Sequence, residues 1–134
     1  MDFVLLDTDV LSYLSKGDTR AERYQKFLIG KIACISWQTV AEAYKWAEKR
    51  DWSETRRKWL ETCLGEYLIL PLDRDTALAW AIVCARREKR GRPISCSDAW
   101  IAASAVRWGC PLITNNERHF RCIDSLVVNS DPLS

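Results

Sequence analysis

Short runs of apolar residues alternate along the chain with longer segments that have a helical pattern. The apolar runs lack alternating polar positions, which is typical of strands in a parallel sheet that is covered on both faces. We predict five such strands, of which the last is the weakest, at residues 3–6, 32–35, 67–70, 112–114 and 126–128. Helices are predicted between them at residues 10–15, 19–29, 37–49, 53–64, 75–89 and 98–108.

Two of the predicted helices indicate how the layers pack. Residues 37–49 carry apolar side chains at spacings of three and four, which form one stripe along an amphipathic helix. Residues 98–108 are apolar on almost every side, so we expect a helix buried at the centre of the fold. Because strands and helices alternate, the sequence predicts an α/β fold with a mainly parallel sheet. The length suits a single domain spanning residues 1–134.

Composition and net charge exclude only a few classes of protein. Hydrophobic residues make up 48% and charged residues 28%, which excludes disordered and collagen-like chains. No apolar run approaches the ~18 residues that a membrane span needs, and the acidic start does not resemble a signal peptide. We therefore expect a cytoplasmic protein with no membrane partner. The net charge of +2 neither requires nor excludes a nucleic-acid partner.

The six cysteines have no Cys-x-x-Cys spacing, which favours reduced thiols over a disulfide framework. His119 and Cys122 could share a zinc ion only with further ligands. The chain has one histidine and no thiolate cluster, so we do not expect zinc.

Acidic and amide side chains follow the predicted strands. Asp7 ends the first strand, Glu42 lies in the second turn of the helix after the second strand, and Asn116 comes shortly after the fourth. Because the carboxyl ends of parallel strands share one edge of a sheet, these side chains should lie there together. Asp98, at the start of the buried helix, joins them if that helix begins at the same edge.

Several carboxylates in one cleft need a proton or a cation. Two unit charges 4 Å apart repel by about 4 kcal/mol at an effective dielectric of 20. Oxygen ligands without histidine or thiolate favour Mg²⁺ or Mn²⁺, which can activate water and neutralise charge on a phosphodiester. The combination predicts metal-dependent phosphodiester hydrolysis. Each residue alone has a simpler interpretation: Asp7 and Asp98 as helix caps, Glu42 as a solvated side chain, Asn116 as a turn residue.

Four short motifs occur in an order that resembles PIN-domain ribonucleases, and within them the VapC-type toxins of toxin–antitoxin pairs. These motifs are LLDTDVL at 5–11, VAE at 40–42, ISCSD and IAA between 94 and 103, and LITNN with HF between 112 and 120. The resemblance covers nearly the whole chain. It implies a three-layer α/β/α sandwich around a mainly parallel sheet of four to five strands.

The resemblance also implies a site. Asp7, Glu42 and Asp98 match the three acids of the family, and Asn116 matches a fourth position that carries Asp or Asn. We expect Asp7 and Asp98 to hold the ion, Glu42 to complete its ligands or orient the attacking water, and Asn116 to position water. A hydroxide ion then attacks phosphorus in line and leaves a 5′-phosphate.

The neighbours of these acids are assigned in the same way. Thr8 and Thr114 match hydroxyls near the metal. Asp9 departs from the Asn or Ser usual in these toxins. It could tighten metal binding, raise the pKa of a neighbouring acid or cap the first helix, and we favour the cap. The family cleaves single-stranded or loop RNA, commonly tRNA or rRNA, with Mg²⁺ or Mn²⁺. Its members usually form homodimers and are silenced by a small antitoxin protein.

Two further features could contact a partner. Residues 86–92 hold five basic residues against one acid, so Arg90 and Arg92 are candidates to contact RNA; the alternative is a solvated helix end. Three tryptophans lie in or near the predicted helices 37–49 and 53–64, where the pattern is more polar, and could belong to a dimer or antitoxin surface: Trp46, Trp52 and Trp59.

Two other functions remain open at this point. A PIN-like fold could be a catalytically silent binding module, although this chain retains the three main acids. Asp7-Thr8-Asp9 after an apolar strand also resembles the start of haloacid-dehalogenase-type phosphatases. Those enzymes need a hydroxyl where this chain has Leu11.

Overall fold

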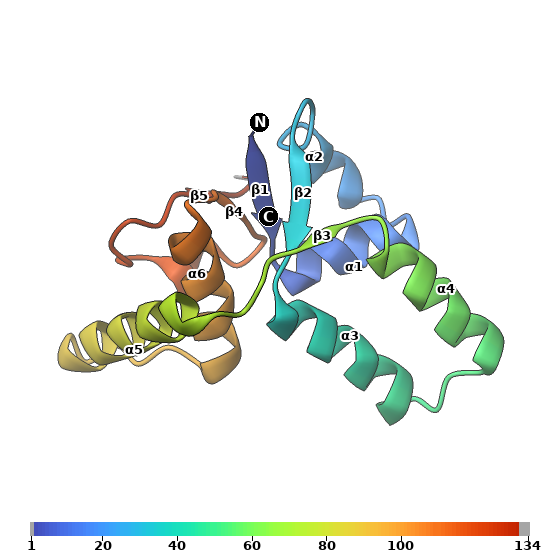
Figure 1. Cartoon of the computed structure of the whole chain (residues 1–134). Coiled ribbons are helices and arrows are strands. Elements are labelled where there is room, and N and C mark those ends of the chain that lie inside the picture. The colour runs from blue at the N-terminus through green and yellow to red at the C-terminus, as the bar shows by residue number, and fades with distance from the viewer. Residues whose placement is uncertain (1, 132–134) are drawn as a thin grey trace.

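The computed structural model of the protein describes residues 2–131 and contains one five-stranded sheet (Figure 1). The strands are β1 (Phe3–Leu6), β2 (Ile32–Ile35), β3 (Leu68–Ile69), β4 (Leu112–Ile113) and β5 (Val128–Asn129). Their order across the sheet is β3-β2-β1-β4-β5, and every neighbouring pair is parallel. The predicted parallel sheet is therefore confirmed.

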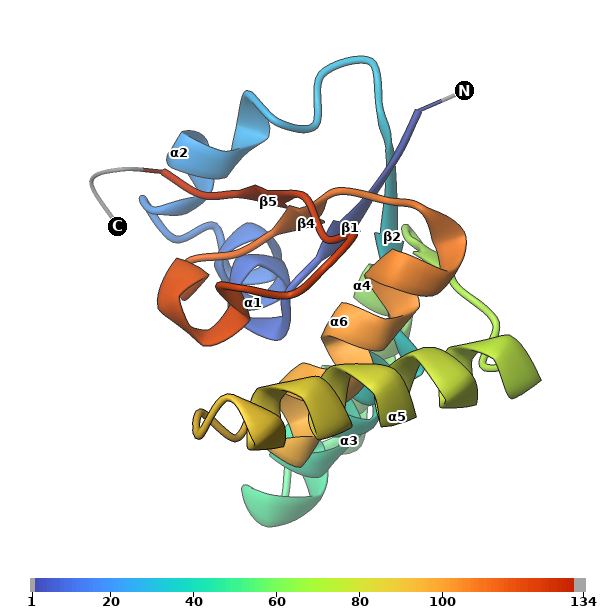
Figure 2. The same cartoon turned by 90° about the vertical axis from the view of Figure 1, so that its left-hand side faces the viewer.

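Helices cover both faces of this sheet. They are α1 (Thr8–Lys16), α2 (Ala21–Gln25), α3 (Trp37–Lys49), α4 (Glu54–Leu64), α5 (Arg74–Lys89), α6 (Cys96–Trp108) and the 3₁₀ helix η1 (Glu117–Phe120). Helices α5 and α6 pack side by side as a pair (Figure 2). Among the described residues, no helix is both long and apolar enough to cross a membrane.

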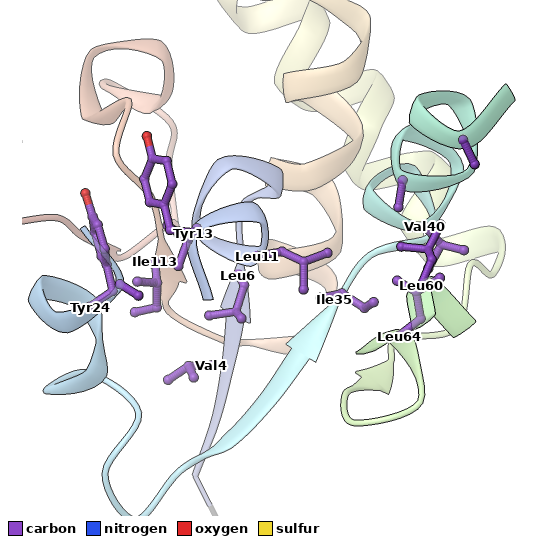
Figure 3. Close-up of a cluster of buried hydrophobic side chains, with 14 of the residues drawn as sticks. Val4, Leu6, Leu11, Tyr13, Tyr24, Ile35, Val40, Leu60, Leu64 and Ile113 are labelled. Carbon is purple, nitrogen blue, oxygen red and sulfur yellow. The ribbon is translucent and has the colours of Figure 1, made fainter. Parts of the chain in front are cut away.

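The alternating side chains of β1 divide the core in two. Val4 and Leu6 face a cluster that takes in residues of α1, α2, α3 and α4 (Figure 3). Leu5 faces the opposite way, into a second cluster with residues of α5 and α6. Both faces of the central strand are thus buried, which explains why its sequence shows no polar alternation. The three-layer α/β/α sandwich is confirmed.

Caps fix the starts of the helices nearest the edge where β1, β2 and β4 end. Asp7 caps α1 by accepting a hydrogen bond from the Thr8 amide, 2.8 Å away. Ser36 accepts one from the Thr39 amide at the start of α3, at 3.2 Å. Ser95 accepts one from the Asp98 amide in α6, also at 3.2 Å. Each cap sets the direction in which its helix leaves this edge.

The structure moves several predicted boundaries. Helix α2 is much shorter than the predicted helix 19–29. Asp18 does not sit at its N-cap, because its carboxylate instead accepts hydrogen bonds from the backbone and side chain of Arg20. Helix α6 begins at Cys96 rather than at Asp98 because Ser95 caps it. Strand β5 lies at residues 128–129, where its register with β4 places it.

The predicted partner surface of tryptophans is wrong in part. Trp52 is only 6% exposed and packs against Trp59, with ring centres 6.1 Å apart. Trp46 and Trp59 are half-buried against the same core. The exposed tryptophans are instead Trp37 and Trp108. Helical periodicity missed this because Trp52 precedes α4 and turns inward from a loop.

Candidate active site

A cavity of about 520 Å³ lies at the edge where β1 and β4 end and where α3 and α6 begin. The predicted site residues that line it are Asp7, Thr8, Asp9, Glu42, Asp98 and Asn116. Thr114 lies behind them and contacts Asp7. The structure therefore brings the three acids and Asn116 together from four separate parts of the chain.

Asp7 is the most buried acid of the cavity, at 5% exposure. One carboxylate oxygen accepts a hydrogen bond from the Thr8 amide at 2.8 Å, and the other accepts one from the Thr114 hydroxyl at 2.6 Å. Burial raises the pKa of Asp7 to about 7, and the nearby charges of Asp9 and Asp98 add to the rise. Within residues 2–131, no basic side chain forms an ion pair with it.

Asp9 joins two segments of the site. It lies in the first turn of α1, where its Oδ1 accepts a hydrogen bond from the Val10 amide at 2.7 Å. Its Oδ2 accepts one from the Asn116 side-chain amide at 2.9 Å. Burial also raises the pKa of Asp9. The prediction that Asp9 caps the first helix is wrong, because Asp7 occupies that position.

Asp98 and Glu42 reach the cavity from two different helices. Asp98 lies in the first turn of α6, and its Oδ2 is 3.2 Å from Nδ1 of His119. Glu42 is half-buried on α3 and accepts a hydrogen bond from the Gln38 side chain at 2.9 Å. His119 was not among the predicted site residues. The signal that could have found it is its place just after the Asn116 motif.

The two threonines have different partners. Thr114 accepts a hydrogen bond from the Asn116 amide at 2.9 Å while its own hydroxyl donates to Asp7. Thr114 thus links the loop after β4 to the most buried acid. The Thr8 hydroxyl lies 2.9 Å from that of Thr39, a fully buried residue of α3. That contact joins the starts of α1 and α3. Thr39 was not among the predicted site residues, because nothing in the local pattern of α3 distinguishes it from other buried residues.

The acids are gathered but not arranged as ligands. In the described part of the chain, no group of three His, Cys, Asp or Glu side chains is placed to hold a metal ion as it stands. Asp7 and Glu42 instead accept hydrogen bonds from Thr114 and Gln38, and Asp98 lies against the His119 ring. The oxygen-rich donor set and the unpaired charge of Asp7 nevertheless fit a hard divalent cation once these side chains rotate.

The cations of the cavity differ from those expected. Lys16 and Arg50 line it, whereas Arg90 and Arg92 do not. Arg90 donates a hydrogen bond to the Cys122 carbonyl at 2.6 Å and lies 3.8 Å from Asp124. An RNA contact by Arg90 or Arg92 stays a prediction. Lys16 and Arg50 were missed because they resemble ordinary solvated residues at helix ends.

Comparison with known proteins agrees with this geometry. The PIN domain family matches residues 4–125. A Haemophilus influenzae protein named ribonuclease VapC2 is 33% identical over 124 residues, which cover 91% of this chain and 92% of that protein. The tRNA(fMet)-specific endonuclease VapC of Shigella flexneri is 28% identical over 122 residues, with the same coverage.

Solved structures of the same type share the fold. The VapBC-1 structure from nontypeable Haemophilus influenzae matches with a TM-score of 0.82 at 28% identity, over 96% of this chain and 97% of that one. The DNA-bound VapBC structure from Salmonella typhimurium matches with a TM-score of 0.78 at 26% identity, over 97% and 98%. The resemblance in the sequence motifs is confirmed, and the chain belongs to the PIN-domain family, in its VapC branch.

Proposed function

We propose that the protein is a metal-dependent endoribonuclease and the toxin of a type II toxin–antitoxin pair. The observation that carries the proposal is that Asp7, Glu42, Asp98 and Asn116 line one cavity. The chain around that cavity matches VapC ribonucleases over nine-tenths of its length. The substrate class is tRNA or rRNA, and one relative is named a tRNA(fMet)-specific endonuclease.

Asp7, Asp98 and Glu42 would hold the ion, which would be Mg²⁺ or Mn²⁺. Such an ion activates water and neutralises charge that develops on the phosphate. The protein prepares the site by fixing Asp7 through Thr114. The unpaired charge of Asp7 supports this assignment, because a cation would restore its ionised form at neutral pH.

The remaining side chains act on water and phosphate. Glu42 stands at the cavity wall, where it orients the water that attacks phosphorus in line. Asn116, held by Asp9 at 2.9 Å, positions a water molecule by hydrogen bonds. His119 restrains Asp98. The leaving oxygen departs from the opposite side of phosphorus, and the product carries a 5′-phosphate.

The proposal includes protein partners. The VapBC structures that match this fold are toxin–antitoxin complexes, which supports a small antitoxin here. Exposed apolar side chains offer a surface for such a partner or for a second copy in a homodimer: Trp37 and Leu72, which line one shallow cavity, are 49% and 55% exposed. The cytoplasm is the compartment in which antitoxin and RNA would meet this chain.

The test uses purified protein, tRNA and rRNA, with Mg²⁺, Mn²⁺ or EDTA. We expect cleavage with either ion and none in EDTA, and an Asp98→Asn protein should cut roughly 10³-fold more slowly. Its helix cap is retained, because Ser95 binds the backbone amide of residue 98. Sequencing RNA 5′ ends after brief expression, with the same variant as control, would locate the cut.

Two outcomes would overturn the proposal. A folded Asp98→Asn protein that cuts as fast as the parent would remove the site assignment. A parent that cuts no RNA with either ion would favour the catalytically silent binding module. The phosphatase alternative receives no support, since the chain belongs to the PIN-domain family.

A further inference from the structure

A second cavity, of about 450 Å³, adjoins the acid-lined one along α3. Glu42, Trp46, Arg50 and Ser97 line both cavities. The two therefore form one continuous groove that leads away from the acids. Its far part is bounded by Lys45 and Lys49, one helical turn apart on α3.

The cations of this groove form no ion pairs with the acids of the described chain. We name Lys16, Lys45, Lys49 and Arg50 the basic wall; all four are exposed. Within residues 2–131, none of them forms an ion pair. The nearby Glu42 carboxylate binds Gln38 instead. These exposed cations are therefore free to bind the phosphates of a polyanion.

Trp46 lies between the acids and the lysines. Trp46 is half-buried against the core cluster and also lines both cavities. Lys16 Nζ is 5.6 Å from the ring centre. An aromatic face beside unpaired cations is the combination that binds single-stranded nucleic acid, in which phosphates meet the cations and bases stack on the ring.

We propose that this groove binds the RNA strand flanking the cleavage site, with phosphates on the basic wall and a base on Trp46. The inference rests on the proposed function and adds which residues hold the substrate. RNA fits better than an acidic protein segment because the groove runs directly into the acid-lined cavity. A strand that is cut must place one phosphodiester in that cavity, and its neighbouring phosphates then lie along the groove beside the basic wall.

The test measures the salt dependence of binding. A fluorescent single-stranded oligoribonucleotide of about 12 nucleotides is titrated with the parent in EDTA, so that it stays intact, over a series of salt concentrations. We expect Lys45→Gln/Lys49→Gln to weaken binding about tenfold at low salt. The plot of log K against log[salt] has a negative slope, which should become less steep by about 1.4 in this variant, since each phosphate contact on a single strand contributes about 0.7.

A matched control separates the groove from net charge. Lys31→Gln/Lys58→Gln removes the same charge from lysines outside the groove, which pair with Asp2 and Glu54. This control should keep the parent's slope. Trp46→Leu should weaken binding about fivefold and Trp46→Phe less, because phenylalanine keeps a ring for stacking. If Trp46→Leu does not fold, the salt slope of Lys45→Gln/Lys49→Gln still tests whether the groove binds RNA.

Cleavage kinetics distinguish this inference from the proposed function. Lys45→Gln/Lys49→Gln should raise KM and leave kcat nearly unchanged, whereas Asp98→Asn should lower kcat. A parent that cuts RNA, with an unchanged salt slope in the lysine variant, would overturn the groove assignment alone. A second titration uses polyglutamate in place of RNA. If the parent binds polyglutamate and Lys45→Gln/Lys49→Gln does not, while the RNA salt slope is unchanged, the groove binds an acidic protein partner and the RNA assignment is wrong. A parent that neither binds nor cuts RNA would overturn both proposals.

Discussion

Two groups of positive charge in this molecule have opposite surroundings. The basic wall of Lys16, Lys45, Lys49 and Arg50 has no ion-pair partner among residues 2–131. The arginine clamp, by which we mean Arg86, Arg87 and Arg90 at the end of α5, has every guanidinium engaged. Arg87 is buried and donates to the carbonyls of residues 92, 119 and 121, while Arg86 and Arg90 bind Asp124.

The acids show the same contrast. Asp73 is bound by Arg107 at 2.7 Å, and these hydrogen bonds hold its pKa well below the usual range. Asp7 forms no ion pair with the described part of the chain, and burial raises its pKa. Paired charges fasten elements of the fold together, as Asp73 and Arg107 join α5 to α6. The groove brings charges without ion-pair partners together from α1 and α3, and a cation and an RNA strand would complete them.

The largest expected effect comes from Asp7. Asp7→Asn should lower RNA cleavage on the order of 10³-fold, or about 4 kcal/mol in transition-state stabilisation. The same change should raise the unfolding temperature of the metal-free protein at pH 8, because it removes a buried, unpaired charge. Asp73→Asn is the matched control: it should lower the unfolding temperature and leave cleavage nearly unchanged. Equal losses of stability in both variants would contradict the comparison.

The next effect concerns the arginine clamp. Arg87→Met should lower the free energy of unfolding by about 3 kcal/mol, because three backbone carbonyls lose their donor. Chemical denaturation would measure it. Arg86→Gln, which breaks only an exposed ion pair with Asp124, should cost less than about 1 kcal/mol. A loss of unfolding free energy in Arg87→Met as small as that in Arg86→Gln would mean that Arg87 does not hold the loop after β4 against α5.

The stability of the metal-free parent should also depend on pH. Asp7 binds its proton more tightly in the folded chain, with a pKa of about 7 against 3.8 in the unfolded chain. Its contribution to stability is therefore fully present below pH 3.8 and is lost as the pH rises through 7. Between pH 5 and 7 we expect a loss of about 2 kcal/mol, absent in Asp7→Asn. A parallel pH profile for the two proteins would contradict this origin.

The smallest expected effect is on RNA binding by the two arginines at the end of α5, and it distinguishes them from the basic wall. Arg90→Gln/Arg92→Gln should change the salt slope of RNA binding by less than about 0.5, because Arg90 is held by Cys122 and Asp124. The measurement is the oligoribonucleotide titration used for the basic wall. A fall as large as that of Lys45→Gln/Lys49→Gln would restore the prediction that these arginines contact RNA and would remove the contrast.

Much of this architecture could be predicted from local pattern. Unbroken apolar runs indicated the parallel strands, and the rule that strand ends share an edge placed Asp7, Glu42 and Asn116 in one cavity. Asp98 followed once its helix was taken to begin at that edge. These inferences succeed because hydrophobic periodicity determines which elements form the helix and sheet layers. Chain connectivity then determines that the residues after each parallel strand lie at the same edge of the sheet.

The sequence could not show which charges find partners. Arg90 and Lys45 carry the same charge on exposed side chains, and only the packing of the loop around Asp124 against the end of α5 binds one of them. The Asp9 contact with Asn116 joins residues far apart in sequence. Trp52 turns inward from a loop, where no periodic signal exists.

Thermal unfolding with Mn²⁺ tests the central claim that the unpaired acids of this cavity bind a divalent cation. Titration of Mn²⁺ should raise the unfolding temperature of the parent until the site is saturated, because the ion binds only the folded chain. In Asp98→Asn the rise should be largely lost. No rise in the parent, or an equal rise in the variant, would contradict the account.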